Sequence, residues 1–183
     1  MKILDIKTNQ LSIGLNKPFK TALRTLYQIE AVVVEIITEQ DRGYGAASPT
    51  AVITGDTNSS ILGAIDFIRP LIIGKDVSNF EYILTTLNKC IVGNTSAKAA
   101  IDIALYDLYG KLYNAPVYRL LGGYRNKLKT DITISLNTPD EMAADSLKAV
   151  NEGFDNLKVK VGKDSDLDIK RMQAIRKAVG DKV

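Results

Sequence analysis

A strand with two unlike faces is indicated by Asp155-Asn156-Leu157-Lys158-Val159-Lys160-Val161-Gly162, in which apolar and polar residues alternate. Lys158 and Lys160 are two positions apart, so both belong to one face, with Cα atoms roughly 6.5–7 Å apart. If that face looks into a barrel or cleft, burial and mutual repulsion both disfavour the charged form of a lysine. A lysine in that state accepts a proton near neutral pH. The alternative is an ordinary surface strand whose polar side lies in water.

The residues around this stretch have the pattern of a chain in which strands alternate with helices. Residues 129–136 predict a strand, and Thr138-Pro139-Asp140-Glu141 predicts a capping box that starts a helix ending before Gly153. A second helix is predicted for residues 166–179. Such alternation indicates a parallel sheet or barrel, so residues 126–183 are predicted to be the first two βα units of a TIM-like (β/α) barrel. The apolar residues expected to face inward are Met142, Leu147, Val150, Ile169, Met172, Ile175 and Val179.

The N-terminal part has strands first and helices afterwards, which is typical of an α+β domain. Strands are predicted at residues 2–13, 29–38 and 44–47, and together they form an antiparallel meander. Three helices follow within residues 57–113. We expect the first to begin at Asp56 or Thr57 and stop at Pro70, and the second to open with a capping box from Ser78 to Glu81 and end at Gly93. Residues 1–125 are therefore predicted to be one α+β domain.

The composition excludes several classes of site. The chain has no histidine, which removes Ser-His-Asp and Cys-His nucleophile systems and the usual zinc sites. Proton chemistry must then use Lys, Asp, Glu or Tyr, and a metal site must be rich in oxygen, which favours Mg²⁺. The net charge of +3 is small and scattered, which argues against a nucleic-acid partner. No apolar run approaches the roughly 20 residues that cross a membrane, so we expect no membrane partner.

The length and the single cysteine set two further expectations. Cys90 excludes an internal disulfide, and together with an N-terminus that has no signal-peptide pattern it suggests a cytoplasmic protein. A complete (β/α)₈ barrel takes roughly 250 residues, far more than residues 128–183 supply. We therefore expect the chain to be part of a longer protein or of an assembly, either with a complementing C-terminal fragment or as a homo-oligomer.

The motifs at the end of the predicted helices carry a family resemblance. They are Ala99-Ala100-Ile101-Asp102-Ile103-Ala104-Leu105-Tyr106-Asp107, then Lys111, then Pro116-Val117-Tyr118-Arg119-Leu120-Leu121-Gly122-Gly123. This arrangement resembles the end of the capping domain in the enolase superfamily, and the Lys158-x-Lys160 strand is similar to that of its muconate-lactonizing-enzyme subgroup. Within the subgroup, Thr21-Ala22-Leu23-Arg24-Thr25, Ile53-Thr54-Gly55-Asp56 and the strand with Thr133 resemble dipeptide epimerases, especially the L-Ala-D/L-Glu type.

The resemblance, which covers essentially the whole chain, implies a capping domain over a barrel and proton transfer at the carbon next to a carboxylate. Enzymes of the superfamily use a Lys or His base with Mg²⁺ that stabilises the enediolate. By resemblance, Lys160 is the base on one face of the substrate, and Lys158 favours its unprotonated form and touches the substrate carboxylate. The second base and the carboxylate ligands of Mg²⁺ lie on later strands in the family, so this chain is expected to contain no metal ligand.

Two further residues are candidates for binding a small dipeptide. Arg24 lies in a loop that closes over the substrate in such enzymes, where a guanidinium suits a side-chain carboxylate. Thr133 shares a strand face with Asp131 and Ser135 and is a candidate substrate contact. A solvated Arg24 and a structural Thr133 are the alternatives.

Other functions share the same residues. A muconate-type cycloisomerase, an N-acylamino-acid racemase and an o-succinylbenzoate synthase also have the Lys-x-Lys strand by resemblance. A non-catalytic binding or assembly protein is the alternative outside the family.

Overall fold

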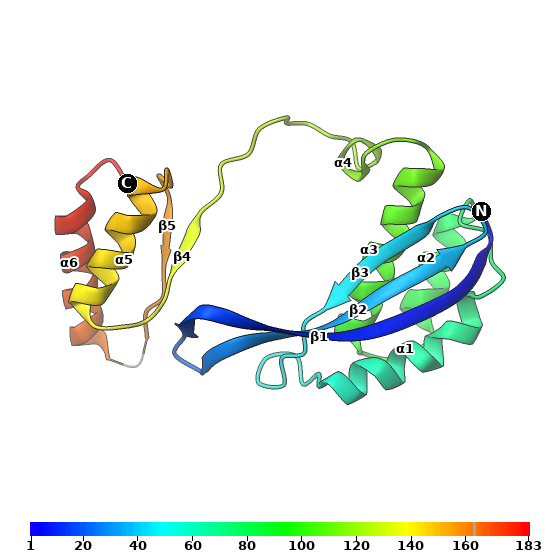
Figure 1. The fold of residues 1–183 in the computed structure, drawn as a ribbon, viewed down its shortest axis with the longest axis horizontal. Coiled ribbons are helices and arrows are strands. Elements are labelled where there is room, and N and C mark those ends of the chain that lie inside the picture. Colours follow the sequence, from blue (N-terminus) through cyan, green and yellow to red (C-terminus); the bar gives the residue numbers. More distant parts are fainter. Residues whose placement is uncertain (163) are drawn as a thin grey trace. The chain divides into compact units, whose positions relative to one another are not determined.

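The structure, a computed structural model, describes residues 1–162 and 164–183 (Figure 1). The chain packs as two units. The first unit contains residues 1–13 and 29–124, and the second contains residues 14–28 and 125–183. The hairpin of residues 14–28 therefore packs with the C-terminal part of the chain, although the rest of each of its strands belongs to the first unit. The domain boundary at residue 125 stays a prediction.

The sheet of the first unit confirms the predicted meander. Its strands β1 (Ile3–Lys20), β2 (Thr25–Thr38) and β3 (Arg42–Ala47) lie in the order β1-β2-β3, and β2 pairs antiparallel with β3. From Val32 to the end of β2 every second side chain is buried, as expected for a strand with one covered face; these are Val32, Val34, Ile36 and Thr38. The first two strands are longer than predicted because they continue into the hairpin.

Four helices follow the sheet: α1 (Asn58–Ile72), α2 (Phe80–Lys89), α3 (Thr95–Leu112) and the short α4 (Val117–Leu120). The first three cover one face of the sheet and enclose a single apolar core with it (Figure 1). Helix α3 lies so close to β3 that a Cβ atom at Gly45 would be 1.9 Å from the carbonyl oxygen of Ala100. Only glycine permits this approach of strand and helix backbones.

Three predicted features of these helices are wrong. Helix α1 continues through Pro70 to Ile72. Pro70 has no backbone N–H, so the helix lacks one hydrogen bond at this position. Burial of Ile72 in the core favours the last half-turn despite this loss. Helix α2 has no capping box, because the backbone and hydroxyl of Ser78 both donate to the Asp76 carboxylate, at 2.9 and 2.7 Å. It ends at Lys89, four positions before Gly93.

The second unit confirms the predicted alternation of strands and helices. Its elements are β4 (Ile132–Ile134), α5 (Pro139–Asn151), β5 (Leu157–Val159) and α6 (Ser165–Val179). The two strands pair in parallel, with Ile132 opposite Leu157. The capping box from Thr138 to Glu141 is present, with proline at the start of the helix.

The apolar core of the second unit differs in part from the prediction. Met142 and Ile175 are buried, but Leu147, Ile169 and Met172 are 45%, 57% and 43% exposed. Helix α6 turns Arg171 and Ile175, four positions apart, toward the interior, which leaves Ile169 and Met172 to the sides. No helix in the described part of the chain is both long and apolar enough to cross a membrane.

Candidate functional site

The polar face of the β4–β5 pair carries three of the four candidate residues. Thr133 and Lys158 are direct partners in the parallel register. Lys160 follows two residues later, and its backbone N–H donates to the carbonyl of Ile134 at 3.1 Å. The intervening residues Ile134 and Val159 pack against the helices. Because alternate residues of a strand point to opposite faces, Thr133, Lys158 and Lys160 share the face that the helices leave uncovered.

Thr133 and Lys158 are the middle residues of their strands, and Lys160 follows the carboxyl end of β5, the end at which barrel enzymes place their active sites. Thr133 and Lys160 are half-buried and Lys158 is exposed. The sequence predicts that both amines lose solvent, and the exposure of Lys158 differs from that expectation. The reason is that the described sheet of this unit has two strands, so no further strand faces Lys158. No hydrogen bond or ion pair joins either ammonium group to another described residue.

Arg24 lies in the tight turn that closes the β1–β2 hairpin. The Thr21 hydroxyl accepts from the backbone N–H groups of Leu23 and Arg24, each at 3.2 Å. The backbone N–H of Thr21 donates to the Arg24 carbonyl at 2.9 Å. The turn thus fixes the backbone of Arg24, while its half-buried guanidinium has no hydrogen bond or ion pair with any other described residue.

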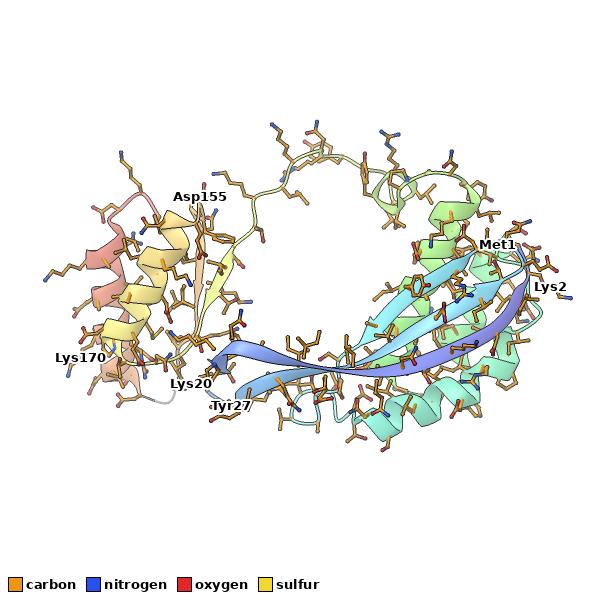
Figure 2. All side chains as sticks on the ribbon, in the orientation of Figure 1. Met1, Lys2, Lys20, Tyr27, Asp155 and Lys170 are labelled. Atoms are coloured by element: carbon orange, nitrogen blue, oxygen red, sulfur yellow. The ribbon has the colours of Figure 1, made fainter. Side chains whose placement is uncertain are left out.

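The hairpin is attached to the end of β4 next to the site. The backbone N–H of Lys20, labelled in Figure 2, donates to the Ser135 hydroxyl at 2.7 Å, and the Leu136 N–H donates to the Lys20 carbonyl at 3.1 Å. The Lys20 ammonium donates to the side-chain oxygen of Asn137 at 2.7 Å. The hairpin that carries Arg24 is therefore bonded to the strand that carries Thr133, within the second unit.

The prediction missed a buried polar network behind this site. The Arg171 guanidinium donates to the Asn137 carbonyl at 2.7 Å and to the Asp168 carboxylate at 2.8 Å. Asp168 also accepts from the backbone N–H of Gly162 at 2.7 Å. These two hydrogen bonds, from Gly162 first and Arg171 second, lower the pKa of the Asp168 carboxyl. The only sequence signal was the three-residue spacing of Asp168 and Arg171, which places them on one helix face.

The described residues do not offer a magnesium site. No group of three or more carboxylates, histidines or cysteines in them could hold a metal ion. Asp168, beside the strand of the two lysines, is already occupied by Gly162 and Arg171. The described residues therefore do not supply the group of oxygen ligands that a hard cation such as Mg²⁺ needs.

The chain is similar to known epimerases over its whole length. It is 57% identical to the L-Ala-D/L-Glu epimerase of Clostridium acetobutylicum, covering 100% of this chain and 52% of that protein. The substrate-liganded L-Ala-D/L-Glu epimerase of Bacillus subtilis matches with a TM-score of 0.97 and 48% identity, covering 100% of this chain and 52% of that one. The dipeptide epimerase of Enterococcus faecalis, complexed with Mg and L-Leu-L-Tyr, matches with a TM-score of 0.96 and 41% identity, over 100% and 52% of the two chains. The chain thus spans about half the length of the curated relatives it matches.

A family model also matches more than half of the chain. Residues 4–122 match the N-terminal domain of the mandelate racemase / muconate lactonizing enzyme family. The matched residues contain the three-stranded sheet and the helices that cover it. The chain belongs to the mandelate racemase / muconate lactonizing enzyme family.

Proposed function

We propose that this chain is part of a dipeptide epimerase that removes and returns the α-proton next to a carboxylate. The observation that carries the proposal is the face that Thr133, Lys158 and Lys160 share on two parallel strands, with Lys160 just past the carboxyl end of β5. The similarity to dipeptide epimerases over the full chain supports it.

Lys160 is the residue that we assign to proton transfer. Its uncharged amine would take the α-proton, and the electron pair of the C–H bond would stay on the carbon beside the carboxylate. Return of the proton by Lys160 restores the starting configuration, because it comes to the same face. Inversion needs a second acid on the opposite face, and that group would come from outside the described residues.

The other three residues would bind and orient the dipeptide. The Lys158 ammonium offers a positive charge to the carboxylate next to the reacting carbon, and the Thr133 hydroxyl offers a hydrogen bond on the same face. Arg24 can form paired hydrogen bonds with a side-chain carboxylate, which favours an acidic dipeptide such as L-Ala-L-Glu. Mg²⁺, which is present in the Enterococcus faecalis complex, would stabilise negative charge and would take its ligands from outside the described residues.

The test is hydrogen exchange by the complete enzyme, meaning this chain together with the remaining strands of its barrel. With L-Ala-L-Glu and Mg²⁺ in D₂O, we expect loss of the α-proton signal of glutamate and appearance of the epimer. Lys160→Ala should slow exchange by roughly 10²- to 10⁴-fold, the usual contribution of a positioned acid or base. Lys170→Ala, which removes an exposed lysine of α6 (Figure 2), is the matched control and should exchange normally.

Other outcomes would assign the chain elsewhere. Exchange with N-acylamino acids and not with dipeptides would indicate a racemase of that class. Turnover of a muconate or of an o-succinylbenzoate precursor without exchange would indicate the corresponding cycloisomerase or synthase. Absence of every one of these reactions in the complete enzyme would favour a non-catalytic binding or assembly protein.

Two properties of the whole protein stay predictions. A cytoplasmic location agrees with the free thiol of Cys90. Assembly as a homo-oligomer or with a complementing C-terminal fragment can be decided by the molecular mass of the native protein in solution.

A further inference from the structure

The backbone that carries Lys160 is fixed at two points. The N–H of Lys160 itself donates to the Ile134 carbonyl of β4, at 3.1 Å. Two residues later the chain turns at Gly162, whose φ of +119° is open to glycine and strained for other residues, and the Gly162 N–H donates to Asp168. The position of the Lys160 backbone, from which its side chain extends, is therefore fixed by one contact to β4 and one to α6.

Arg171 connects the second of these points to the segment that follows β4. It is 8% exposed, and its side chain donates to Asp168, which holds Gly162, and to the carbonyl of Asn137, which follows β4. A buried arginine that satisfies partners on two elements fixes the distance between them, because its guanidinium is planar and its donors have fixed directions. Arg171 touches none of the four candidate site residues through a hydrogen bond that the structure shows.

We propose that Arg171 is a positioning residue for proton transfer, which sets the place of Lys160 relative to β4 through Asp168 and Gly162. The proposal rests on the proposed function, in which Lys160 carries the proton. Lys20 of the hairpin with Arg24 also binds Asn137, but its hydrogen bonds with Ser135 and Leu136 involve neither Arg171 nor a partner of Arg171 and should hold the hairpin when Arg171 is replaced. Loss of Arg171 should therefore impair proton transfer more than substrate binding.

The kinetic test compares Arg171→Gln and Arg171→Lys in the complete enzyme with Arg176→Gln. Arg176 lies on the same helix and is exposed, with hydrogen bonds to the carbonyls of Gly180 and Val183. We expect Arg171→Gln to lower kcat for α-proton exchange about 10- to 100-fold, as displacement of a catalytic group by about 1 Å can do, with KM changed less than about 3-fold. Arg171→Lys should be intermediate and Arg176→Gln unchanged. Unchanged kcat in Arg171→Gln, or a rise in KM at constant kcat, overturns the proposal.

A second measurement does not depend on activity. In the same proteins, amide hydrogen exchange at Lys160 and Gly162 should speed up in Arg171→Gln by about 10-fold or more, while the amide of Val34 in β2 exchanges as before. If the complete wild-type enzyme exchanges no α-proton, the proposed function fails, and the amide measurement still decides whether Arg171 fixes this backbone. Should Arg171→Gln not fold, Asp168→Asn takes its place. A kcat and amide exchange equal to those of Arg176→Gln then overturn the proposal.

Discussion

At the scale of single residues, the four candidate site residues have side-chain polar groups with no hydrogen-bond or ion-pair partner among the described residues. Several polar side chains of the same unit are paired: Lys20 with Asn137, Lys17 with Asp145, and Asp168 with Arg171. A side chain that a fold holds in place but leaves unpaired is available for a ligand.

Arg24 gives the most direct prediction about substrate choice. Arg24→Met in the complete enzyme should raise KM for L-Ala-L-Glu by roughly 10- to 100-fold, because a hydrogen bond to a charged group contributes about 1.5–3 kcal/mol. KM for L-Leu-L-Tyr, which has no side-chain carboxylate, should change little. Steady-state kinetics with both dipeptides measures the difference. An equal rise in KM for both would mean that Arg24 supports the turn and does not select the acidic side chain.

Gly162 gives a prediction about stability at the end of β5. A Cβ atom there would lie 3.1 Å from the Cβ of Ala22, and the backbone φ is +119°. Gly162→Ala should therefore destabilise the fold by about 1–3 kcal/mol, the usual cost of such a conformation. The urea midpoint of unfolding measures this. Gly14→Ala is the matched control, because a Cβ at Gly14 meets no atom within 4 Å and its φ is not in the left-handed region. A midpoint for Gly162→Ala equal to that of Gly14→Ala would contradict the argument.

At the scale of elements, the start of α2 shows how a local motif can be displaced by a neighbour. The predicted capping box fails because Asp76 accepts both donors of Ser78. These hydrogen bonds, the backbone one first, lower the pKa of the Asp76 carboxyl to about 2 from an ordinary value of 3.8. A carboxyl group whose pKa is lower in the folded protein stabilises the fold at pH values above its pKa in the unfolded chain. This stabilisation is lost as the pH falls through the pKa of the folded protein.

The pH dependence of unfolding should therefore contain a contribution from Asp76. Between about pH 4 and pH 2, the melting temperature of the wild type should fall more steeply than that of Asp76→Asn, which has no carboxyl to protonate. Thermal unfolding followed by circular dichroism at several pH values measures both slopes. The other carboxyl groups are common to the two proteins and cancel in the comparison. Parallel curves over this range would show that Asp76 does not contribute.

The elements themselves could be predicted because their signals are local. The alternation in β2 and β5 and the capping box at Thr138 each depend on a few adjacent residues. The failed capping box has a local cause, the Asp76 carboxylate two residues before Ser78, whereas the Arg171 network depends on contacts that a local pattern does not contain. The sequence pattern does not indicate that Arg171 is buried, because an arginine on a helix is expected to face water. Its burial depends on the carbonyl of Asn137 and the carboxylate of Asp168. Arg24 and Thr133 are candidates through the family resemblance, since neither has a distinctive local pattern.

At the scale of the whole molecule, the four candidate site residues belong to one packing unit. Arg24 comes from the N-terminal strands, but its hairpin packs with the strands of Thr133, Lys158 and Lys160. The sequence predicts a boundary at residue 125, which assigns Arg24 to the other domain. The packing of the hairpin depends on Lys20 and Ser135, which are far apart in the sequence and carry no motif.

The attachment of the hairpin gives the last prediction. The Ser135 hydroxyl accepts from the Lys20 N–H at 2.7 Å and donates to the Lys20 carbonyl at 3.2 Å. Ser135→Ala leaves a partly buried N–H without this acceptor, which costs about 1–3 kcal/mol. The hairpin should loosen, so that KM for L-Ala-L-Glu rises several-fold while kcat changes little, because the Lys160 backbone is held by other contacts. Steady-state kinetics and the urea midpoint measure the two effects.

Lys17→Ala is the control for this variant, because it also breaks a contact between the hairpin and the rest of the second unit. Its ion pair with Asp145 is short, at 2.6 Å, but the Lys17 side chain is 54% exposed. Exposed ion pairs contribute about 0–1 kcal/mol, so Lys17→Ala should leave KM and the midpoint nearly unchanged. If the two variants behave alike, the attachment does not depend on the Ser135 hydroxyl. A loss of kcat in Ser135→Ala would instead mean that the hairpin and the Lys160 backbone move together.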